Sequence, residues 1–312
     1  MPKNLVSLII PAYQEEKMLP VATTRITKIL EDAGISFEIL YIDDGSRDES
    51  WKVICTLAEH NPHVRGLSLS RNFGKEAAIC AGLDRAQGDC CLVMDCDLQH
   101  PPEYIPDMVR SWREEDYDVV RGVKRERQSE SALNRAFART FYRMLHALGG
   151  VDLQDASDFV LMDRKVVDAW KQLPERQPFF RAMSDWVGFH KKEFEFDVAD
   201  RTIGESHWSF KQLANLAVHS LTAYSYVPLQ LSTMLGGGLG VLSVILVLIA
   251  LIRQISGLYC GTFWIGALVS FGFACVLVCM GILGIYAGKT YEEAKGRPRY
   301  LIGRAVNIKE NR

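Results

Sequence analysis

The chain has 312 residues, of which 48% are hydrophobic and 24% charged, and its formal net charge is −2. This length suffices for one sizeable globular domain and a smaller part, and the hydrophobic content excludes a disordered chain. Because a surface that neutralises nucleic-acid phosphates is normally strongly basic, the charge balance argues against a nucleic-acid binder. The 8 cysteines lack zinc-ligand spacing, which favours reduced thiols in a cytosolic compartment.

Short apolar runs alternate with stretches of helical length in the amino-terminal part. The runs are LVSLII (5–10), FEILYI (37–42), VRGLSLS (64–70), CCLVMD (90–95) and YDVVRGV (117–123). Runs of this length and β-branched content are typical of buried strands. Their alternation with helices predicts an α/β fold with a mostly parallel sheet that is covered on both faces.

Polar segments follow four of these predicted strands, where ligands bind in such sheets. They are PAYQEE (11–16), DDGSR (43–47), RNFGK (71–75) and DCD (95–97). Each has a structural alternative: Ser46-x-x-Glu49 fits a helix capping box, RNFGK fits a tight loop, and a lone D-x-D is often structural. Their convergence on one edge favours a ligand or metal site, because like charges there would otherwise repel.

Asp95 and Asp97 close the fourth run, immediately before the prolines at 101 and 102. Residues two apart on an extended segment point to the same side, so both carboxylates can present oxygens together. Mg²⁺ and Mn²⁺ prefer such ligands and take others from substrate phosphates. The pattern therefore predicts a divalent-metal site.

Residues 208–232 carry apolar residues at helical spacing and a cluster of aromatic residues, and Pro228 ends the run. This pattern predicts an amphipathic interfacial helix that lies in the lipid headgroup layer. It would hold the site at the height of a lipid phosphate.

Two long apolar stretches follow, at about 233–252 and 263–288, and Arg253 is the only Asp, Glu, Lys or Arg between Lys211 and Lys289. Each meets the length of a membrane-spanning helix, so we expect a two-helix transmembrane hairpin rather than a buried hairpin of a soluble domain. Basic residues after the second stretch place both termini, including a tail at 289–312, in the cytoplasm.

The segments PAYQEE, YIDDGSRDES, RNFGK, DCDLQHPPE and RTIGESHWS, followed by two spans, resemble the polyprenyl-phosphate glycosyltransferases of the dolichol-phosphate-mannose-synthase type. These are inverting enzymes of glycosyltransferase family two, and the hairpin is similar to that of the bacterial membrane-anchored branch. The resemblance implies a GT-A-like, Rossmann-related mixed sheet, with residues 1–207 as a cytoplasmic catalytic domain at the inner membrane.

The resemblance also implies roles for individual residues. It assigns nucleotide binding to Pro11, Tyr13, Glu15, Asp43, Asp44, Lys75 and Asp95. It assigns Mg²⁺ or Mn²⁺ to Asp95 and Asp97, with Gln99 beside the metal. Arg201 and Ser206 match an RxxGxS element that closes over the diphosphate, while His207 and Ser157 stand where the family more often has Lys and Gly.

Two acidic residues, Asp155 and Asp158, are candidates to face the sugar's anomeric carbon, and we favour Asp155. A basic segment can meet the lipid phosphate; its members include Arg121, Lys124, Arg125, Arg127, Arg135 and Arg139. The alternative for that segment is a solvated basic helix beside anionic headgroups.

The expected reaction transfers a sugar from a nucleotide-sugar, with UDP-glucose favoured, to undecaprenyl phosphate. GDP-mannose-dependent and aminoarabinose-type transfer are alternatives for the sugar. A sugar nucleotidyltransferase and a non-catalytic membrane scaffold are alternatives of a different class. The oligomeric state stays open, with a homo-oligomer as one alternative.

Overall fold

A computed structural model describes residues 5–124, 156–173, 180, 187–196, 245, 248, 249, 252, 255, 256 and 262–308. The chain divides into two compact units. The first comprises residues 1–146, 150–206 and 297–312, and the second comprises residues 147–149 and 207–296. The first contains the sheet and the second contains the long helix α10 (Thr262–Ala294).

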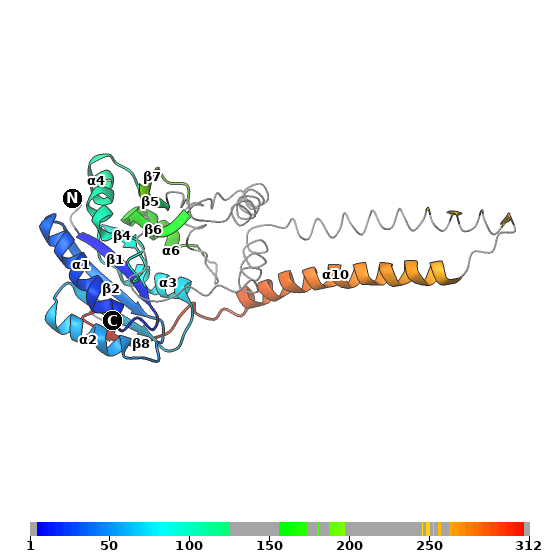
Figure 1. The fold of residues 1–312 in the computed structure, drawn as a ribbon, viewed down its shortest axis with the longest axis horizontal. Helices are drawn as coiled ribbons and strands as arrows, with labels where there is room; N and C mark the ends of the chain where they lie inside the picture. The colour runs from blue at the N-terminus through cyan, green and yellow to red at the C-terminus, as the bar shows by residue number, and fades with distance from the viewer. Residues whose placement is uncertain are drawn as a thin grey trace. The chain divides into compact units, whose positions relative to one another are not determined.

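The first unit is built on an 8-stranded sheet with the order β7-β5-β6-β4-β1-β2-β3-β8 (Figure 1). The strands are β1 (Leu5–Ala12), β2 (Ser36–Asp43), β3 (Val64–Leu69), β4 (Cys90–Val93), β5 (Val119–Lys124), β6 (Ala156–Asp163), β7 (Lys191–Phe196) and β8 (Ile302–Val306). Strand β1 is parallel to β2 and β4, β2 to β3, and β5 to β7. Pairs β4–β6, β5–β6 and β3–β8 are antiparallel. The predicted mixed, mostly parallel sheet is confirmed.

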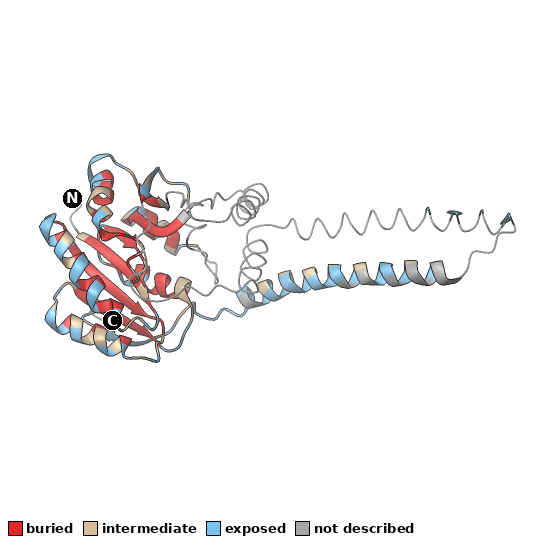
Figure 2. Cartoon of the chain, in the orientation of Figure 1, coloured by how far each residue is buried: buried red, intermediate tan, exposed pale blue. Residues whose placement is uncertain are grey.

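Helices cover both faces of this sheet. One layer contains α1 (Met18–Asp32), α2 (Ser50–His60), the short η1 (Pro102–Tyr104) and α4 (Ile105–Glu114), and the other contains α3 (Lys75–Arg85) and α6 (Arg164–Lys171). Successive residues of β1 alternate between the layers, because strand side chains have a period of two. Leu8 and Ile10 join the first core, whereas Ile9 joins the second. Figure 2 shows the central strands β1, β2 and β4 as mostly buried, whereas the edge strands β7 and β8 are largely exposed or intermediate.

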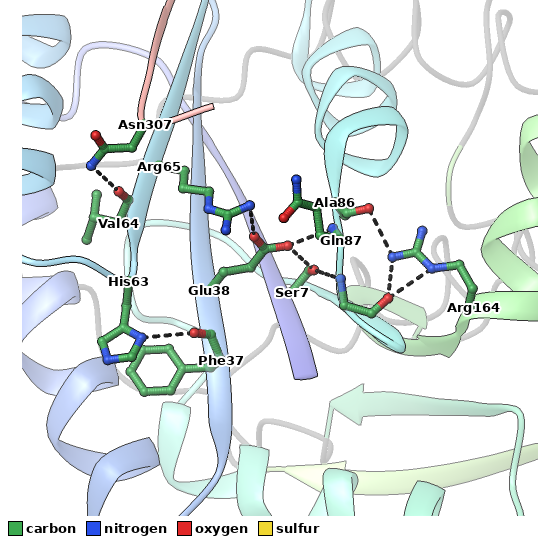
Figure 3. Close-up of polar contacts among 11 residues, drawn as sticks. Ser7, Phe37, Glu38, His63, Val64, Arg65, Ala86, Gln87, Arg164 and Asn307 are labelled. Atoms are coloured by element: carbon green, nitrogen blue, oxygen red, sulfur yellow. Dashed lines mark hydrogen bonds and ion pairs between the residues drawn. The ribbon is translucent and has the colours of Figure 1, made fainter. Parts of the chain in front are cut away.

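A buried polar network crosses the strands near their amino-terminal ends (Figure 3). Glu38 is only 3% exposed, and its carboxylate pairs with Arg65 at 2.5 Å. It also accepts the Gln87 N–H at 2.7 Å and the Ser7 hydroxyl. A buried charge is tolerated only when it is paired and hydrogen-bonded, so these contacts fix the register of β1, β2, β3 and the turn before β4.

The last strand, β8, comes from residues that the sequence assigns to a tail. It pairs with β3 in the register Gly66 to Val306 and Leu67 to Ala305. Asn307 extends the contact by donating to the carbonyl oxygens of Ala58 at 2.7 Å and Val64 at 3.1 Å. The carboxy-terminal residues are therefore part of the sheet.

Helix α10 covers the second predicted span. Within the part of the chain that the structure describes, one helix, at Phe271–Tyr291, is long and apolar enough to cross a membrane. The first predicted span, at about 233–252, lies largely outside the described residues, and the interfacial segment 208–232 lies wholly outside them. The structure thus supports one apolar helix, and it does not support the expected two-helix hairpin.

Candidate active site

The loops after β1 and β2 are joined by backbone-to-side-chain hydrogen bonds. Ser46 Oγ accepts the Gln14 N–H at 3.0 Å, and Ser50 Oγ accepts the Glu15 N–H at 2.9 Å. Ser46 therefore does not form the alternative capping box, and α2 begins only at Ser50. Tyr13, at the tip of the first loop, is 43% exposed and is free to meet a flat ligand.

Asp43 and Asp44, at the end of β2, are both buried. Asp43 accepts the Ser46 N–H at 3.0 Å with one oxygen and the Ser68 hydroxyl at 2.8 Å with the other. Two predicted nucleotide-binding residues are thus held rigidly at the carboxyl end of the sheet. The contacts of Asp43 link the second and third strand ends.

The Asp44 carboxylate receives the loop that precedes α3. It accepts the N–H groups of Phe73 at 2.7 Å and Gly74 at 2.8 Å. Burial raises the pKa of Asp44, and the two backbone hydrogen bonds only partly offset that rise. Gly45 allows this approach: its φ is +66°, and a Cβ there would lie 2.4 Å from the Arg71 carbonyl carbon.

Lys75 joins the third, fourth and sixth strand regions. Its Nζ lies 2.5 Å from Asp95 Oδ1 and 2.6 Å from Asp158 Oδ2. Burial raises the pKa of the Asp95 carboxyl, but the attraction of Lys75 outweighs it and the net pKa is lowered. Desolvation lowers the pKa of Lys75, but the attraction of the two carboxylates outweighs it and the net pKa is raised. Lys75 and Asp95 therefore form an ion pair, and the Asp158 carboxyl group contacts the same ammonium group.

The DCD segment follows β4, and its residues 96 and 97 lie in a turn rather than on the extended strand that the sequence analysis expects. Cys96 is buried, while Asp95 and Asp97 are partly exposed. Asp97 Oδ1 accepts the Gln99 N–H at 3.1 Å. Among the described residues no group of three or more His, Cys, Asp or Glu side chains could hold a metal. Two carboxylates alone still fit Mg²⁺ or Mn²⁺, because such ions keep waters and use substrate phosphates.

His100 is a further member of the site that sequence reasoning missed. Its Nδ1 accepts the Asp95 N–H at 3.2 Å, and its ring stacks on Phe159 with the centroids 5.2 Å apart. His100 is only 3% exposed. In the sequence, His100 is marked only by its position within DCDLQHPPE. That position fits a residue that supports Asp95 and a simple turn residue equally well.

The glycosyl transferase family 2 model matches residues 7–170, which is more than half of the 312 residues. The chain belongs to glycosyl transferase family 2. A relative named undecaprenyl-phosphate 4-deoxy-4-formamido-L-arabinose transferase, from Shewanella sediminis, is 35% identical, and the alignment covers 96% of this chain and 92% of the relative. A prophage bactoprenol glucosyl transferase homolog from Escherichia coli is 33% identical, with 96% and 98% covered.

The fold of this family 2 member also resembles solved structures. Glucosyl-3-phosphoglycerate synthase from Mycobacterium tuberculosis, crystallised with Mn²⁺, UDP-glucose and phosphoglyceric acid, matches with a TM-score of 0.52 and 18% identity. The match covers 70% of this chain and 78% of that one. This likeness supports the GT-A-like α/β fold. Family membership makes the protein a glycosyltransferase and removes the nucleotidyltransferase alternative.

Several predicted site residues of this transferase lie outside the described part of the chain. They are Asp155, Arg201, Arg127, Arg135, Ser206 and His207. In the predicted basic segment, Arg121 lies on strand β5 and is only 3% exposed. The alternative of a solvated basic helix is therefore wrong for this residue. The backbone of Lys124 ends the same strand.

Ser157, where the family more often has Gly, is buried on β6. Its hydroxyl donates to the Gly122 carbonyl oxygen at 2.6 Å and accepts the Phe159 N–H at 3.2 Å. The β5–β6 register shifts at this point, between Arg121 and Val123. The Ser157 hydroxyl therefore supplies hydrogen bonds to backbone groups at the irregular β5–β6 pairing, next to Asp158 in the chain.

Proposed function

We propose that this transferase moves a sugar from a nucleoside-diphosphate donor to the phosphate of a polyprenyl phosphate, with inversion at the anomeric carbon. Relatives that align over more than nine-tenths of both chains are named for bactoprenol and undecaprenyl phosphate. The observation that carries the proposal is the cluster of Lys75, Asp95 and Asp158 beside Asp97, at the carboxyl end of the sheet. UDP-glucose is the proposed donor.

The loops after β1 and β2 are proposed to hold the nucleotide. Pro11, Tyr13 and Glu15 border one side, and the rigid Asp43 borders the other. A preformed turn of this kind loses little conformational entropy when a ligand binds. Asp44 is proposed to act indirectly, because its two carboxylate oxygens accept the backbone N–H groups of Phe73 and Gly74, just before Lys75.

Asp95 and Asp97 are proposed to hold Mg²⁺ or Mn²⁺ with the donor's diphosphate. When bound, the ion stabilises the negative charge that develops on the leaving nucleoside diphosphate. Arg201 and Ser206 are proposed to contribute cationic and polar contacts to the same diphosphate. Gln99 follows Asp97 closely in the chain, and its backbone N–H fixes the Asp97 carboxylate.

For the acid at the sugar we propose Asp158, whose contacts the structure describes; Asp155, which the sequence analysis favours, lies outside the described residues. The Asp158 carboxylate is only 4% exposed and points at Lys75 beside Asp95, so it already belongs to the cluster. The nucleophile is a phosphate oxygen, which is largely ionised at neutral pH because its second pKa is about 6. Asp158 is therefore proposed to orient the reactants, and a proton acceptor is not required.

The sheet also constrains the membrane topology. Strands β1 to β7, which precede α10, and β8, which follows it, belong to one sheet, so the chain up to β7 and the chain after α10 lie in one compartment. A chain that leaves a compartment through one membrane span returns only through another. If α10 crosses the bilayer, the segment between β7 and α10 must supply a second crossing, and we propose the apolar stretch at about 233–252 for it.

The topology is testable with a native thiol. Cys260 lies between the two apolar stretches, whereas Cys55 lies on α2. A membrane-impermeant maleimide applied to intact cells should label the protein through Cys260, and Cys260→Ser should abolish the label. Labelling that persists in Cys260→Ser, or that requires cell lysis, would contradict the two-span topology.

The chemistry is tested by the release of nucleoside diphosphate with and without polyprenyl phosphate. Asp97→Asn should remove most transfer while the protein still folds, and EDTA should inhibit the parent reversibly. Asp107→Asn is the matched control, because Asp107 pairs with Arg110 on the exposed face of α4. Full activity in EDTA would exclude the metal site.

The acid is tested by comparing Asp155→Asn with Asp158→Asn at saturating donor between about pH 6 and 9. An orienting Asp158 predicts the larger loss for Asp158→Asn, with a pH–rate profile of unchanged shape. A general base would instead cost about 10²- to 10⁴-fold, with the loss easing at high pH. A larger loss for Asp155→Asn would restore Asp155 as the acid.

A further inference from the structure

Lys75 stands at a position that helix physics disfavours. It is the first residue of α3, where the partial positive charge of the helix dipole opposes a cation. The following residue, Glu76, is the acidic residue that a first turn favours, and its carboxylate accepts the Phe180 N–H at 2.8 Å. A lysine at a position that the helix dipole disfavours points to a role that lies outside helix stability.

The contacts of Lys75 explain its place. Asp95 follows β4, Asp158 lies on β6, and these two strands pair directly. Their carboxylates would repel each other, and the ammonium group offsets that repulsion with contacts of 2.5 and 2.6 Å. The Lys75 side chain is 39% exposed, so its flexible stem can swing toward a ligand.

These contacts compete with the proposed metal site. Asp95 Oδ1 lies against the Lys75 ammonium, and the same carboxylate is needed to ligate a divalent cation. Two cations on one carboxylate repel each other strongly at such short range. A divalent cation that arrives alone must therefore displace Lys75 without offering it a new anionic partner. A nucleoside diphosphate that arrives with the cation does offer one.

We propose that Lys75 is a built-in counter-cation that makes divalent-metal binding depend on the nucleoside diphosphate. It holds Asp95 and Asp158 together in the ligand-free site and transfers its contact from Asp95 to the diphosphate when the donor binds. This inference rests on the proposed function, since it needs both ligands. It goes further by predicting cooperative binding, with a named residue as its cause.

The test measures Mn²⁺ binding to the full-length protein in detergent, by the electron paramagnetic resonance signal of free Mn²⁺, with and without UDP. Wild type should bind Mn²⁺ weakly alone, and UDP should strengthen binding by a factor within the range of about 5- to 150-fold that is usual for coupled sites. Because coupling is reciprocal, Mn²⁺ should strengthen UDP binding by the same factor in calorimetry.

Lys75→Met keeps the length of the side chain and removes its charge. It should bind Mn²⁺ alone more tightly than wild type and lose most of the UDP enhancement, and Lys75→Gln should behave alike. Lys165→Met is the matched control, because Lys165 pairs with Asp118 at 2.6 Å away from this cluster and should keep the wild-type coupling. Far-UV circular dichroism checks that each variant is folded.

Two outcomes would overturn the inference alone. One is an unchanged UDP enhancement in a folded Lys75→Met or Lys75→Gln protein. The other is weaker binding of Mn²⁺ alone by these variants, which would make Lys75 a residue that assembles the metal site. If wild type binds neither UDP nor Mn²⁺, the proposed function fails as well, so the two failures are distinguishable.

Discussion

Replacing Gly45 by Ala tests whether the approach of the second and third strand-end loops shapes the site. Gly45 has φ +66°, and a Cβ there would lie 2.4 Å from the Arg71 carbonyl carbon and 2.7 Å from the Asn72 backbone nitrogen. Backbone atoms cannot rotate away as a side chain can. Gly34 is a matched control, because it has φ +63° and nothing within 4 Å of its added Cβ.

The two substitutions share one cost and differ in another. An L-residue in the left-handed region costs about 1–2 kcal/mol, and we expect that loss of unfolding free energy for Gly34→Ala. Overpacking adds about 1–3 kcal/mol, so Gly45→Ala should lose about 2–5 kcal/mol. The excess over Gly34→Ala is the energy of the loop contact.

Urea denaturation of the full-length proteins in one detergent, followed by tryptophan fluorescence, measures both losses. UDP affinity is the second measurement, because a displaced Arg71–Asn72 backbone also shifts the loop that Asp44 holds before Lys75. Only Gly45→Ala should weaken UDP binding. Equal losses of stability in the two variants, or unchanged UDP affinity in Gly45→Ala, would refute the reasoning.

Three further predictions concern single contacts. Ser157→Ala should cost about 1–3 kcal/mol of unfolding free energy in urea denaturation, because it leaves the buried Gly122 carbonyl without its 2.6 Å donor; no loss would contradict this. Burial raises the pKa of Asp44 in the folded protein. The contribution of this carboxyl group to the free energy of unfolding is therefore greatest below its unfolded pKa of about 3.9, and it falls as the pH rises through the folded pKa. The stability of Asp44→Asn relative to wild type should therefore rise with pH across that window, and a constant difference would argue against it. Tyr300→Phe should lower the free energy of unfolding by about 1 kcal/mol, because it removes the 2.6 Å hydrogen bond to Asp84. If Tyr300→Phe costs the same in the wild-type and Asp84→Asn backgrounds of a double-mutant cycle, the two residues are not coupled.

The strands that could be predicted are those whose sequence carries its own signal. All five apolar runs became strands β1 to β5, because buried parallel strands are continuously apolar. The other three strands were missed. β7 (KKEFEF) has charged residues at four of its six positions and lies at one edge of the sheet, and β8 (IGRAV) is short and follows a long apolar helix. Their pairing is decided by partners distant in sequence, which local patterns do not report.

The site divides in the same way. Asp95 and Asp97 could be singled out because a D-x-D pair follows an apolar run, but the expected extended geometry is absent, since residues 96 and 97 form a turn after β4. The contact of Lys75 with Asp158 joins residues 83 positions apart, so it depends on the pairing of β4 with the missed β6. Strand order, rather than any motif, brings Asp158 to the DCD segment.

The position of β8 has a consequence for biosynthesis. Its residues, Ile302–Val306, are synthesised after the other seven strands of the sheet and after α10. Until they emerge, β3 is an open edge strand with unpaired backbone groups, which is a site for wrong pairing between nascent chains. The sheet is completed only when the residues that follow α10 have been synthesised and have paired with β3. A chain in which β8 is lost or does not reach β3 therefore keeps a permanently unpaired edge, which a quality-control protease or chaperone can recognise.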